Sequence, residues 1–266
     1  MSKIIVVGGG PAGMFAAIAA AQAGKNEVLL LEKNEKLGKK LYITGKGRCN
    51  ITNACDMESL FANVMTNARF LYSAFYACDN RSVIDFFEKN GLNTKVERGS
   101  RVFPASDRAS DVTATLQRVL DREQVKVLLH AQVTHLLWET EEGEDGKTKL
   151  RISGAELAGG RRLLADKVII ATGGLSYPST GSTGDGYRFA EEAGHSVTEC
   201  TPSLVPFYVK EPYAAQLQGL SLKNVEVSIY DGRKLLYREF GEMLFTHFGV
   251  SGPLLLSASA ALKPAV

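Results

Sequence analysis

The sequence predicts an α/β fold in which helices cover a parallel sheet, and three features of its N-terminal part predict this class. Residues 3–7, KIIVV, are an apolar, β-branched run of the kind found in parallel strands that are buried on both faces. The turn GGGPAG over residues 8–13 then opens a helical pattern that Gly24 ends. A second apolar run, EVLLLEK over residues 27–33, completes a strand–helix–strand unit. This order predicts a Rossmann-like nucleotide-binding unit.

The glycine spacing in this unit predicts dinucleotide binding. Gly8, Gly10 and Gly13 fit the pattern G-x-G-x-x-G, which provides a tight turn, a close approach for a pyrophosphate and close helix packing. The helix N-terminus adds free N–H groups and a partial positive charge. Glu32 follows Gly13 by 19 residues, where a carboxylate can accept both ribose hydroxyls of an adenosine and would repel a 2'-phosphate. A glycine-rich turn without a ligand is the alternative, and FAD and NAD both fit at this stage.

Composition and cysteine usage favour a globular cytoplasmic protein, and the charge balance does not select a partner. The 31 basic and 29 acidic residues are spread along the chain, so no basic stripe predicts nucleic-acid binding. Cys49, Cys55, Cys78 and Cys200 form no C-x-x-C pair, which favours a reducing compartment. We expect no membrane span, because no stretch is long and apolar enough, and no metal site, because the histidines lack ligand spacing. The oligomeric state stays open.

The loop GKKLYITGKGRCNITN, residues 38–53, departs from the regular strand–helix alternation of an NAD dehydrogenase. It can be a second wrapping around a cofactor, a metal or redox site built on Cys49, or an irregular surface loop. Lys46 and Arg48 would stabilise a Cys49 thiolate, although a small residue packed against cofactor is favoured. Arg48 can offset pyrophosphate charge and Asn50 can donate to flavin carbonyls, or both can hold the loop together.

The rest of the chain predicts an insertion, a β-meander and a second domain. Helical patterns cover residues 67–77 and 80–91, and Ser110 or Asp111 is the predicted cap of a helix that buries Val112, Leu116 and Val119. The meander includes an acidic turn, EEGEDGK, and is followed by a buried strand that ends in ATGG. Beyond about residue 200, alternating strands around an Asp-Gly turn begin a mainly β domain.

Several long motifs resemble one family of flavoproteins. GKKLYITGKGRCNITN, RVFPASDRASDV, ATGGLSYPSTGSTGDGYRFAEEAGH, TPSLVPF and LFTHFGVSGPLLLSAS are similar to the successive signatures of the aminoacetone oxidase or BaiN-like FAD-dependent oxidoreductases, which have a glutathione-reductase-type fold. The resemblance covers nearly the whole chain. It implies an FAD-binding domain over residues 1–195, with a helical insertion at about 55–122, and the start of a substrate domain over 196–266. Family members continue with a segment that completes the FAD site, so we expect this chain to be C-terminally incomplete.

Within STGSTGDGYRFAEEAGH, Gly181, Gly184 and Gly186 are expected to keep backbone N–H groups open as an anion-binding nest. Asp185 is the predicted cap of the helix that begins near Tyr187, and Gly194 is expected to end that helix. A capped helix after a flexible turn is the alternative.

These patterns and the resemblance predict a set of site residues. His247 can accept a proton while hydride moves to flavin N5, and Arg101 can contact an anionic substrate, although both can be structural. The predicted cofactor contacts are Gly8, Gly10, Pro11, Ala12, Gly13, Glu32, Lys33, Lys40, Thr44, Gly45, Gly47, Arg48, Cys49, Asn50, Ala171, Thr172, Gly173, Gly174, Gly184 and Asp185.

The expected activity is hydride transfer between a small amine, hydroxyl or ketone substrate and flavin N5. Only one G-x-G-x-x-G occurs, so NAD(P)H, if it reduces the flavin, must dock transiently at the active site. The alternatives are a non-catalytic FAD- or NAD-binding or redox-sensing module, an inactive truncated flavoprotein, and an NAD-only dehydrogenase.

Overall fold

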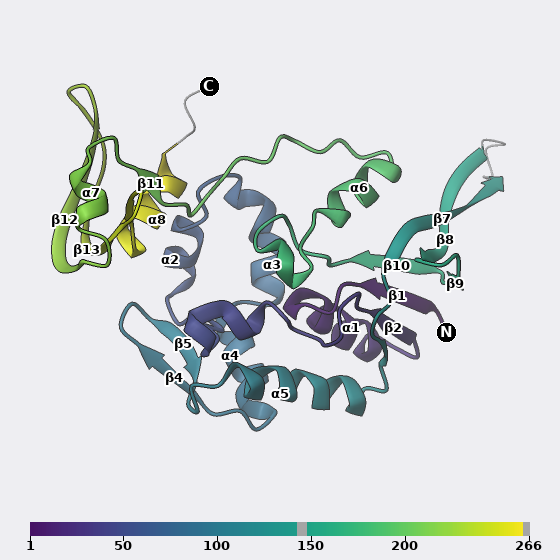
Figure 1. Cartoon of the computed structure of the whole chain (residues 1–266). Coiled ribbons are helices and arrows are strands. Elements are labelled where there is room, and N and C mark those ends of the chain that lie inside the picture. Colours follow the sequence, from purple (N-terminus) through teal and green to yellow (C-terminus); the bar gives the residue numbers. More distant parts are fainter. Residues whose placement is uncertain (143–147, 263–266) are drawn as a thin grey trace. The chain divides into compact units, whose positions relative to one another are not determined.

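The computed structural model describes residues 1–142 and 148–262, and the chain forms two compact units. The first unit comprises Met1–Leu60 and Leu71–Val197, and the second comprises Phe61–Phe70 and the chain from Thr198 onward. Figure 1 labels most elements of both units. Most of the predicted acidic turn, residues 143–147, lies outside the described residues.

The first unit is built on a four-stranded parallel sheet with the order β10-β1-β2-β6. Its strands are β1 Lys3–Val7, β2 Glu27–Leu31, β6 Lys126–Leu128 and β10 Lys167–Ile170. The two central strands are in register, with Val6 opposite Leu30, and β1 pairs on its other side with β10. The predicted α/β class, the first two strands and the helix with Pro11 at its first position are confirmed.

Alternate residues of β1 serve two cores, because successive strand side chains point to opposite faces of a sheet. Ile4 and Val6 pack in the core that contains residues of α1 (Pro11–Gln22) and α5 (Ala109–Arg122). Ile5 and Val7 pack in a second core with residues of the meander and of α6 (Asp185–Glu192). The meander is the antiparallel sheet β7 Val133–Glu142, β8 Thr148–Leu157 and β9 Arg162–Leu164. The sheet is therefore covered on both sides.

Two expectations about α5 have different outcomes. Val112, Leu116 and Val119 are all buried, as predicted. The predicted caps are wrong, because the helix begins at Ala109, which is itself buried, and Arg108 is the N-cap residue without a side-chain cap. Ser110 and Asp111 thus lie inside the first turn, where Asp111 still interacts favourably with the helix dipole.

The strand that leads to ATGG is less buried than predicted. Val168 and Ile169 of β10 are half-buried, and Ile170 is 38% exposed. The physical reason is position, since β10 is an edge strand of the described sheet and pairs only with β1.

The insertion contains smaller elements, and its residues Phe61–Phe70 belong to the second unit. Its antiparallel strands follow the order β3-β5-β4. The predicted helix over 67–77 divides into a 3₁₀ turn, Ala68–Leu71, and α3. The described elements are α2 Met57–Ala62, α3 Tyr72–Ala77, α4 Asn80–Lys89, β3 Thr52–Asn53, β4 Thr94–Glu97 and β5 Arg101–Pro104.

The second unit is mainly β, as predicted. Its antiparallel sheet has the order β11-β14-β13-β12, and the long hairpin turns at Gly232 between Asp231 and Lys234. Its elements are β11 Phe207–Tyr208, α7 Tyr213–Gln216, β12 Ser221–Asp231, β13 Lys234–Thr246, β14 Gly249–Ser251 and α8 Pro253–Ala261. No helix among the described residues of either unit is long and apolar enough to cross a membrane.

Candidate functional site

A cleft of about 260 Å³ opens in the first unit where β1, β2 and β10 end. Carboxyl ends of parallel strands are the usual ligand-binding edge of an open α/β sheet. Eleven predicted cofactor residues line this cleft: Gly8, Gly10, Pro11, Ala12, Glu32, Lys33, Lys40, Ala171, Thr172, Gly173 and Asp185. The structure thus brings together residues from five separate stretches of the sequence.

The glycine turn between β1 and α1 has a different requirement at each position. A Cβ atom on Gly8 would lie 2.5 Å from the Ala171 carbonyl oxygen, and one on Gly13 would lie 1.8 Å from the Gly8 oxygen. Gly13 is buried beneath the turn and does not line the cleft. A Cβ on Gly10 would meet no atom within 4 Å, because Gly10 faces the cleft. Two glycines therefore permit packing, and Gly10 leaves space for a ligand.

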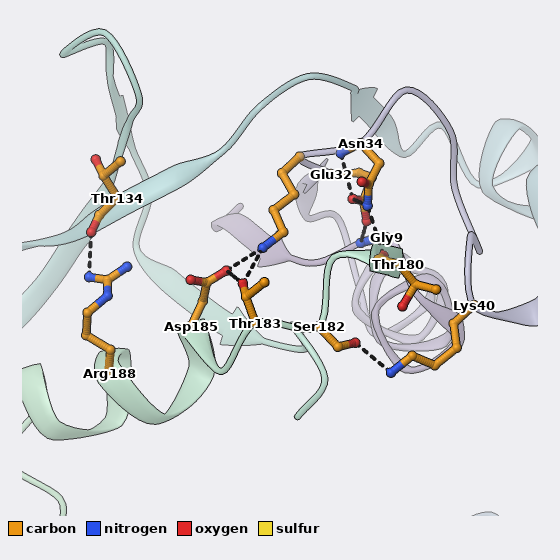
Figure 2. Close-up of polar contacts among 11 residues, drawn as sticks. Gly9, Glu32, Asn34, Lys40, Thr134, Thr180, Ser182, Thr183, Asp185 and Arg188 are labelled. Atoms are coloured by element: carbon orange, nitrogen blue, oxygen red, sulfur yellow. Dashed lines mark hydrogen bonds and ion pairs between the residues drawn. The ribbon is translucent and has the colours of Figure 1, made fainter. Parts of the chain in front are cut away.

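Glu32, immediately after β2, is a buried carboxylate that is 7% exposed. Its Oε2 accepts a hydrogen bond from the Gly9 N–H at 2.7 Å. Its Oε1 accepts from the Asn34 backbone N–H at 2.8 Å and from Asn34 Nδ2 at 2.7 Å (Figure 2). These bonds hold the carboxylate at the cleft beside the glycine turn.

Three side chains after β2 reach the segment that precedes α6. Lys33 Nζ lies 2.7 Å from Asp185 Oδ2 and 2.7 Å from Thr183 Oγ1. Lys40 Nζ donates to Ser182 Oγ at 2.7 Å, and Asn34 Nδ2 donates to the Thr180 carbonyl at 3.1 Å (Figure 2). We call this set of contacts the cross-cleft bridge.

Two expectations about this segment are wrong. Asp185 does not cap a helix near Tyr187, because α6 begins at Asp185 itself and Gly184, with φ of 82°, is the N-cap residue. The N–H groups of Gly181 and Gly184 donate to the Pro178 and Gly174 carbonyls, so these two are not open as a nest. Gly194 ends α6 as predicted, with φ of 82° directly after the cap residue.

Thr172 contributes a buried hydroxyl without a partner. Among the residues that the structure describes, its Oγ1 has no hydrogen bond, although the atom is shielded from solvent. A Cβ on Gly186 would lie 2.7 Å from this oxygen, so α6 approaches the end of β10 closely. Buried hydroxyls are normally bonded, so this oxygen is an exception in a residue that lines the cleft.

The predicted residues Thr44, Gly45, Gly47, Arg48, Cys49 and Asn50 do not line the cleft, and neither do Gly174 and Gly184. Arg48 pairs with Glu97 at 2.8 Å and Asp107 at 3.3 Å, and its guanidinium lies 4.1 Å from the Phe103 ring centroid. With its amide nitrogen directed at them, Asn50 donates to the Thr52 and Val102 carbonyls. In this structure these side chains tie their loop to β4, to β5 and to Asp107.

Cys49 is 1% exposed and belongs to the core beneath the sheet. Burial raises the pKa of its thiol, and a weaker opposing effect comes from a hydrogen bond with Thr44. A raised pKa disfavours the thiolate, so Cys49 has the character of a packed small residue rather than of a redox thiol.

This burial predicts the order of thiol modification. Cys78 and Cys200 are exposed and should react with Ellman's reagent in the native protein, whereas Cys49 should react only on unfolding. Because burial raises the thiol pKa, the folded state binds the Cys49 proton more tightly than the unfolded state does. The stabilisation that results is present at neutral pH and is lost as pH rises above the ordinary thiol range. Mass mapping after timed labelling checks this order, and early labelling of Cys49 would contradict it.

Neither predicted catalytic residue is among the residues that line the cleft. Arg101 is exposed on β5, and its Nε donates to the Arg98 carbonyl at 3.0 Å. His247 is exposed at the turn between β13 and β14 of the second unit, edge-on to Phe248 with 4.8 Å between ring centroids. Within residues 1–142 and 148–262, no three His, Cys, Asp or Glu side chains are grouped to hold a metal ion.

The sequence reasoning missed several lining residues, namely Asn34, Lys39, Gln132, Val133, Thr180, Ser182 and Phe189. Asn34 was detectable, because a polar residue two places after Glu32 lies at the same strand end. Lys39 adjoins the predicted Lys40, and Thr180 and Ser182 lie in the stretch before α6, whereas Gln132, Val133 and Phe189 reach the cleft only through contacts between segments that are distant in sequence.

Comparisons with known proteins agree with this architecture. The family described as HI0933-like protein Rossmann domain matches residues 2–255. The chain is 36% identical over 255 residues to a 3-dehydro-bile acid delta(4,6)-reductase of Clostridium scindens, covering 95% of this chain and 58% of that protein. It is 32% identical over 260 residues to a ribosomal RNA dihydrouridine synthase of Escherichia coli, covering 98% and 61%. The chain therefore spans about 60% of the length of these relatives.

Two solved structures resemble the fold at low sequence identity. A 3-ketosteroid delta1-dehydrogenase from Sterolibacterium denitrificans has a TM-score of 0.58 at 14% identity, over 84% of this chain and 62% of that one. A flavocytochrome c3 fumarate reductase has a TM-score of 0.50 at 20% identity, over 84% and 47%. The family match covers most of the sequence, so the chain belongs to the HI0933-like Rossmann-domain family, and the family resemblance predicted from the sequence is confirmed.

Proposed function

We propose that the chain binds FAD in the cleft of its first unit and acts as part of a flavin-dependent oxidoreductase. The observation that carries the proposal is the glycine turn with Glu32 beside it. Gly10 leaves open space at the N-terminus of α1, whose first-turn N–H groups have no acceptors within the helix. The buried carboxylate of Glu32 adds an acceptor for ribose hydroxyls at the same edge.

The residues present fit a dinucleotide. Thr172 lines the cleft, and its buried hydroxyl, which lacks a partner among the described residues, would be satisfied by a polar group of a ligand if the side chain turned toward it. Lys40 donates only to the Ser176 carbonyl and the Ser182 hydroxyl, and no described carboxylate lies within ion-pair distance of its Nζ. Its charge is thus available to offset a pyrophosphate. Gly10, Ala12 and Lys40 would hold the phosphates, and Glu32 the adenosine ribose.

Bound FAD would supply a hydride-exchanging centre at flavin N5. The names of the relatives favour reduction of a carbon–carbon double bond conjugated to a carbonyl, as in an unsaturated ketone or a uracil ring. This class includes the predicted ketone substrate, and amine or hydroxyl oxidation is the alternative. The chain would bind and orient the substrate, and His247 would exchange the proton at its imidazole. NAD(P)H as a transient reductant is part of this proposal and has no support from the comparisons.

The experiment is anaerobic titration of the reconstituted protein. After reduction of the flavin with dithionite, a conjugated ketone should restore the oxidised flavin spectrum. A non-catalytic module would show no substrate-dependent change with any member of an amine, hydroxyl and ketone panel. An NAD-only dehydrogenase would bind NADH, as measured by a change in NADH fluorescence, and would take up no flavin.

RNA is a second candidate substrate, because relatives from Escherichia coli and Haemophilus influenzae are named ribosomal RNA dihydrouridine synthase. The expected absence of nucleic-acid binding is therefore not confirmed. One feature of the first unit favours RNA. Arg81, Arg98 and Arg101 are exposed near the β4–β5 turn, and no carboxylate of the described chain pairs with them. Arg81 donates to the Ala54 carbonyl, and the Ala54 N–H donates to the Ser100 carbonyl in the β4–β5 turn. Arg81 is therefore linked to this turn through Ala54.

This surface predicts salt-dependent RNA binding. Changing Arg98 and Arg101 to Gln should weaken binding of ribosomal RNA fragments and reduce the slope of log K against log salt by roughly 1 for each lost phosphate contact. A matched control is Arg118→Gln with Arg122→Gln, since these arginines bond Asn90 at the end of α4. Equal slopes in both double variants would count against the RNA candidate.

A further inference from the structure

The cleft holds two residues with opposing consequences for cofactor choice. Glu32 suits a ribose with free hydroxyls, and Lys33 follows it directly and also lines the cleft. A cation close to this acid is the group that accommodates a 2'-phosphate in dinucleotide-binding folds. Selectivity therefore depends on whether the Lys33 charge is free.

Asp185 forms an ion pair with Lys33. Its Oδ2 lies 2.7 Å from Lys33 Nζ, and the two side chains are 22% and 24% exposed. Thr183 Oγ1 contacts both partners, at 2.7 Å from Lys33 Nζ and 3.1 Å from Asp185 Oδ2. Asp185 is fixed as the first residue of α6, so the pair has little freedom to separate.

The ionisation of Asp185 is consistent with this pairing. Burial acts to raise its pKa, but hydrogen bonding and attraction from Lys33, the Thr183 hydroxyl and Arg188 together lower it. The carboxylate is thus ionised at neutral pH and cancels the Lys33 charge.

We infer that Asp185 is a specificity-determining residue, which neutralises Lys33 and so restricts the cleft to dinucleotides whose adenosine ribose carries free hydroxyls. The inference rests on the proposed function, since it requires an adenosine ribose beside Glu32. Asp185, a residue of α6, thus shares with Glu32 the discrimination between a free and a 2'-phosphorylated adenosine ribose.

The test compares two probes, 5'-AMP and adenosine 2',5'-bisphosphate, by isothermal titration calorimetry. The measured quantity is the ratio of the bisphosphate Kd to the AMP Kd. Asp185→Asn should lower this ratio about fivefold, because it releases a partly exposed cation worth up to about 1 kcal/mol. Lys33→Met should raise it by a similar factor, because an unpaired carboxylate remains. The double variant should return close to the wild-type ratio.

Glu27→Gln is the matched control. Glu27 pairs with Lys126 at 2.7 Å at the opposite end of β2, so the change removes one carboxylate and frees one lysine away from the cleft. Its ratio should equal that of the wild type. If AMP binds but Asp185→Asn and Lys33→Met both leave the ratio unchanged, the inference is overturned while the proposed function stands. If the wild type binds neither probe, the proposed function fails, and the inference with it. If circular dichroism shows that Asp185→Asn does not fold, Lys33→Met alone is the test. A raised Kd ratio in that variant supports the inference, and an unchanged or lowered ratio overturns it.

Discussion

A Gly10→Val variant should fold like the wild type and lose FAD binding. The backbone at Gly10 has φ of −75° and ψ of −179°, which valine adopts readily, and a Cβ there would meet no atom within 4 Å. The added side chain would project into the cleft and occupy the space that a pyrophosphate needs. We expect FAD affinity to fall about 100-fold, near the upper range of steric overpacking costs. Thermal unfolding and flavin titration of the same sample separate the two effects.

Gly13→Ala provides the contrast within the same motif. Its Cβ would lie 1.8 Å from the Gly8 carbonyl oxygen, so the turn or the helix must move. This variant should lose stability as well as binding. If Gly10→Val binds FAD as tightly as the wild type, the cleft at the N-terminus of α1 is not the cofactor site.

Replacing Glu32 with alanine should affect both stability and binding. The change removes a buried carboxylate that accepts hydrogen bonds from the Gly9 N–H and from two nitrogen atoms of Asn34. Loss of bonds to a charged group and the unsatisfied donors should cost about 2–3 kcal/mol, or roughly 5–8 °C in Tm. FAD affinity should fall about 100-fold, because the ribose also loses its acceptor.

Glu27→Ala is the control, since Glu27 lies at the other end of β2 in a surface ion pair with Lys126. It should leave both quantities close to wild type. Differential scanning fluorimetry and flavin fluorescence titration measure the two effects. If Glu32→Ala binds FAD with wild-type affinity, Glu32 does not contact the adenosine ribose.

The sequence predicted the parts of the fold that depend on local patterns. The apolar run at residues 3–7 and the glycine spacing fix a strand, a turn and a helix within a few residues of one another. Gly8, Gly10 and Glu32 consequently lie at the cleft. The helix start at Ala109 was missed because Arg108, which provides no side-chain cap, takes the N-cap position that a local pattern assigns to Ser110 or Asp111.

The sequence could not supply contacts between distant segments. Lys33 and Asp185 are 152 residues apart, and Asn34 meets the Thr180 carbonyl across 146 residues. Arg48 has the chemistry of a pyrophosphate contact, but its partner Glu97 lies 49 residues away and was invisible to a local pattern. The edge position of β10, which exposes Ile170, likewise follows from strand order rather than from composition.

The most direct test of the central claim is titration of the purified, flavin-free protein with FAD, followed by flavin fluorescence and visible absorption. We expect saturable binding of one FAD per chain, competition by 5'-AMP, and loss of binding in Gly10→Val at unchanged Tm. A protein that stays colourless after incubation with FAD and gel filtration, with no change in flavin fluorescence, would contradict it.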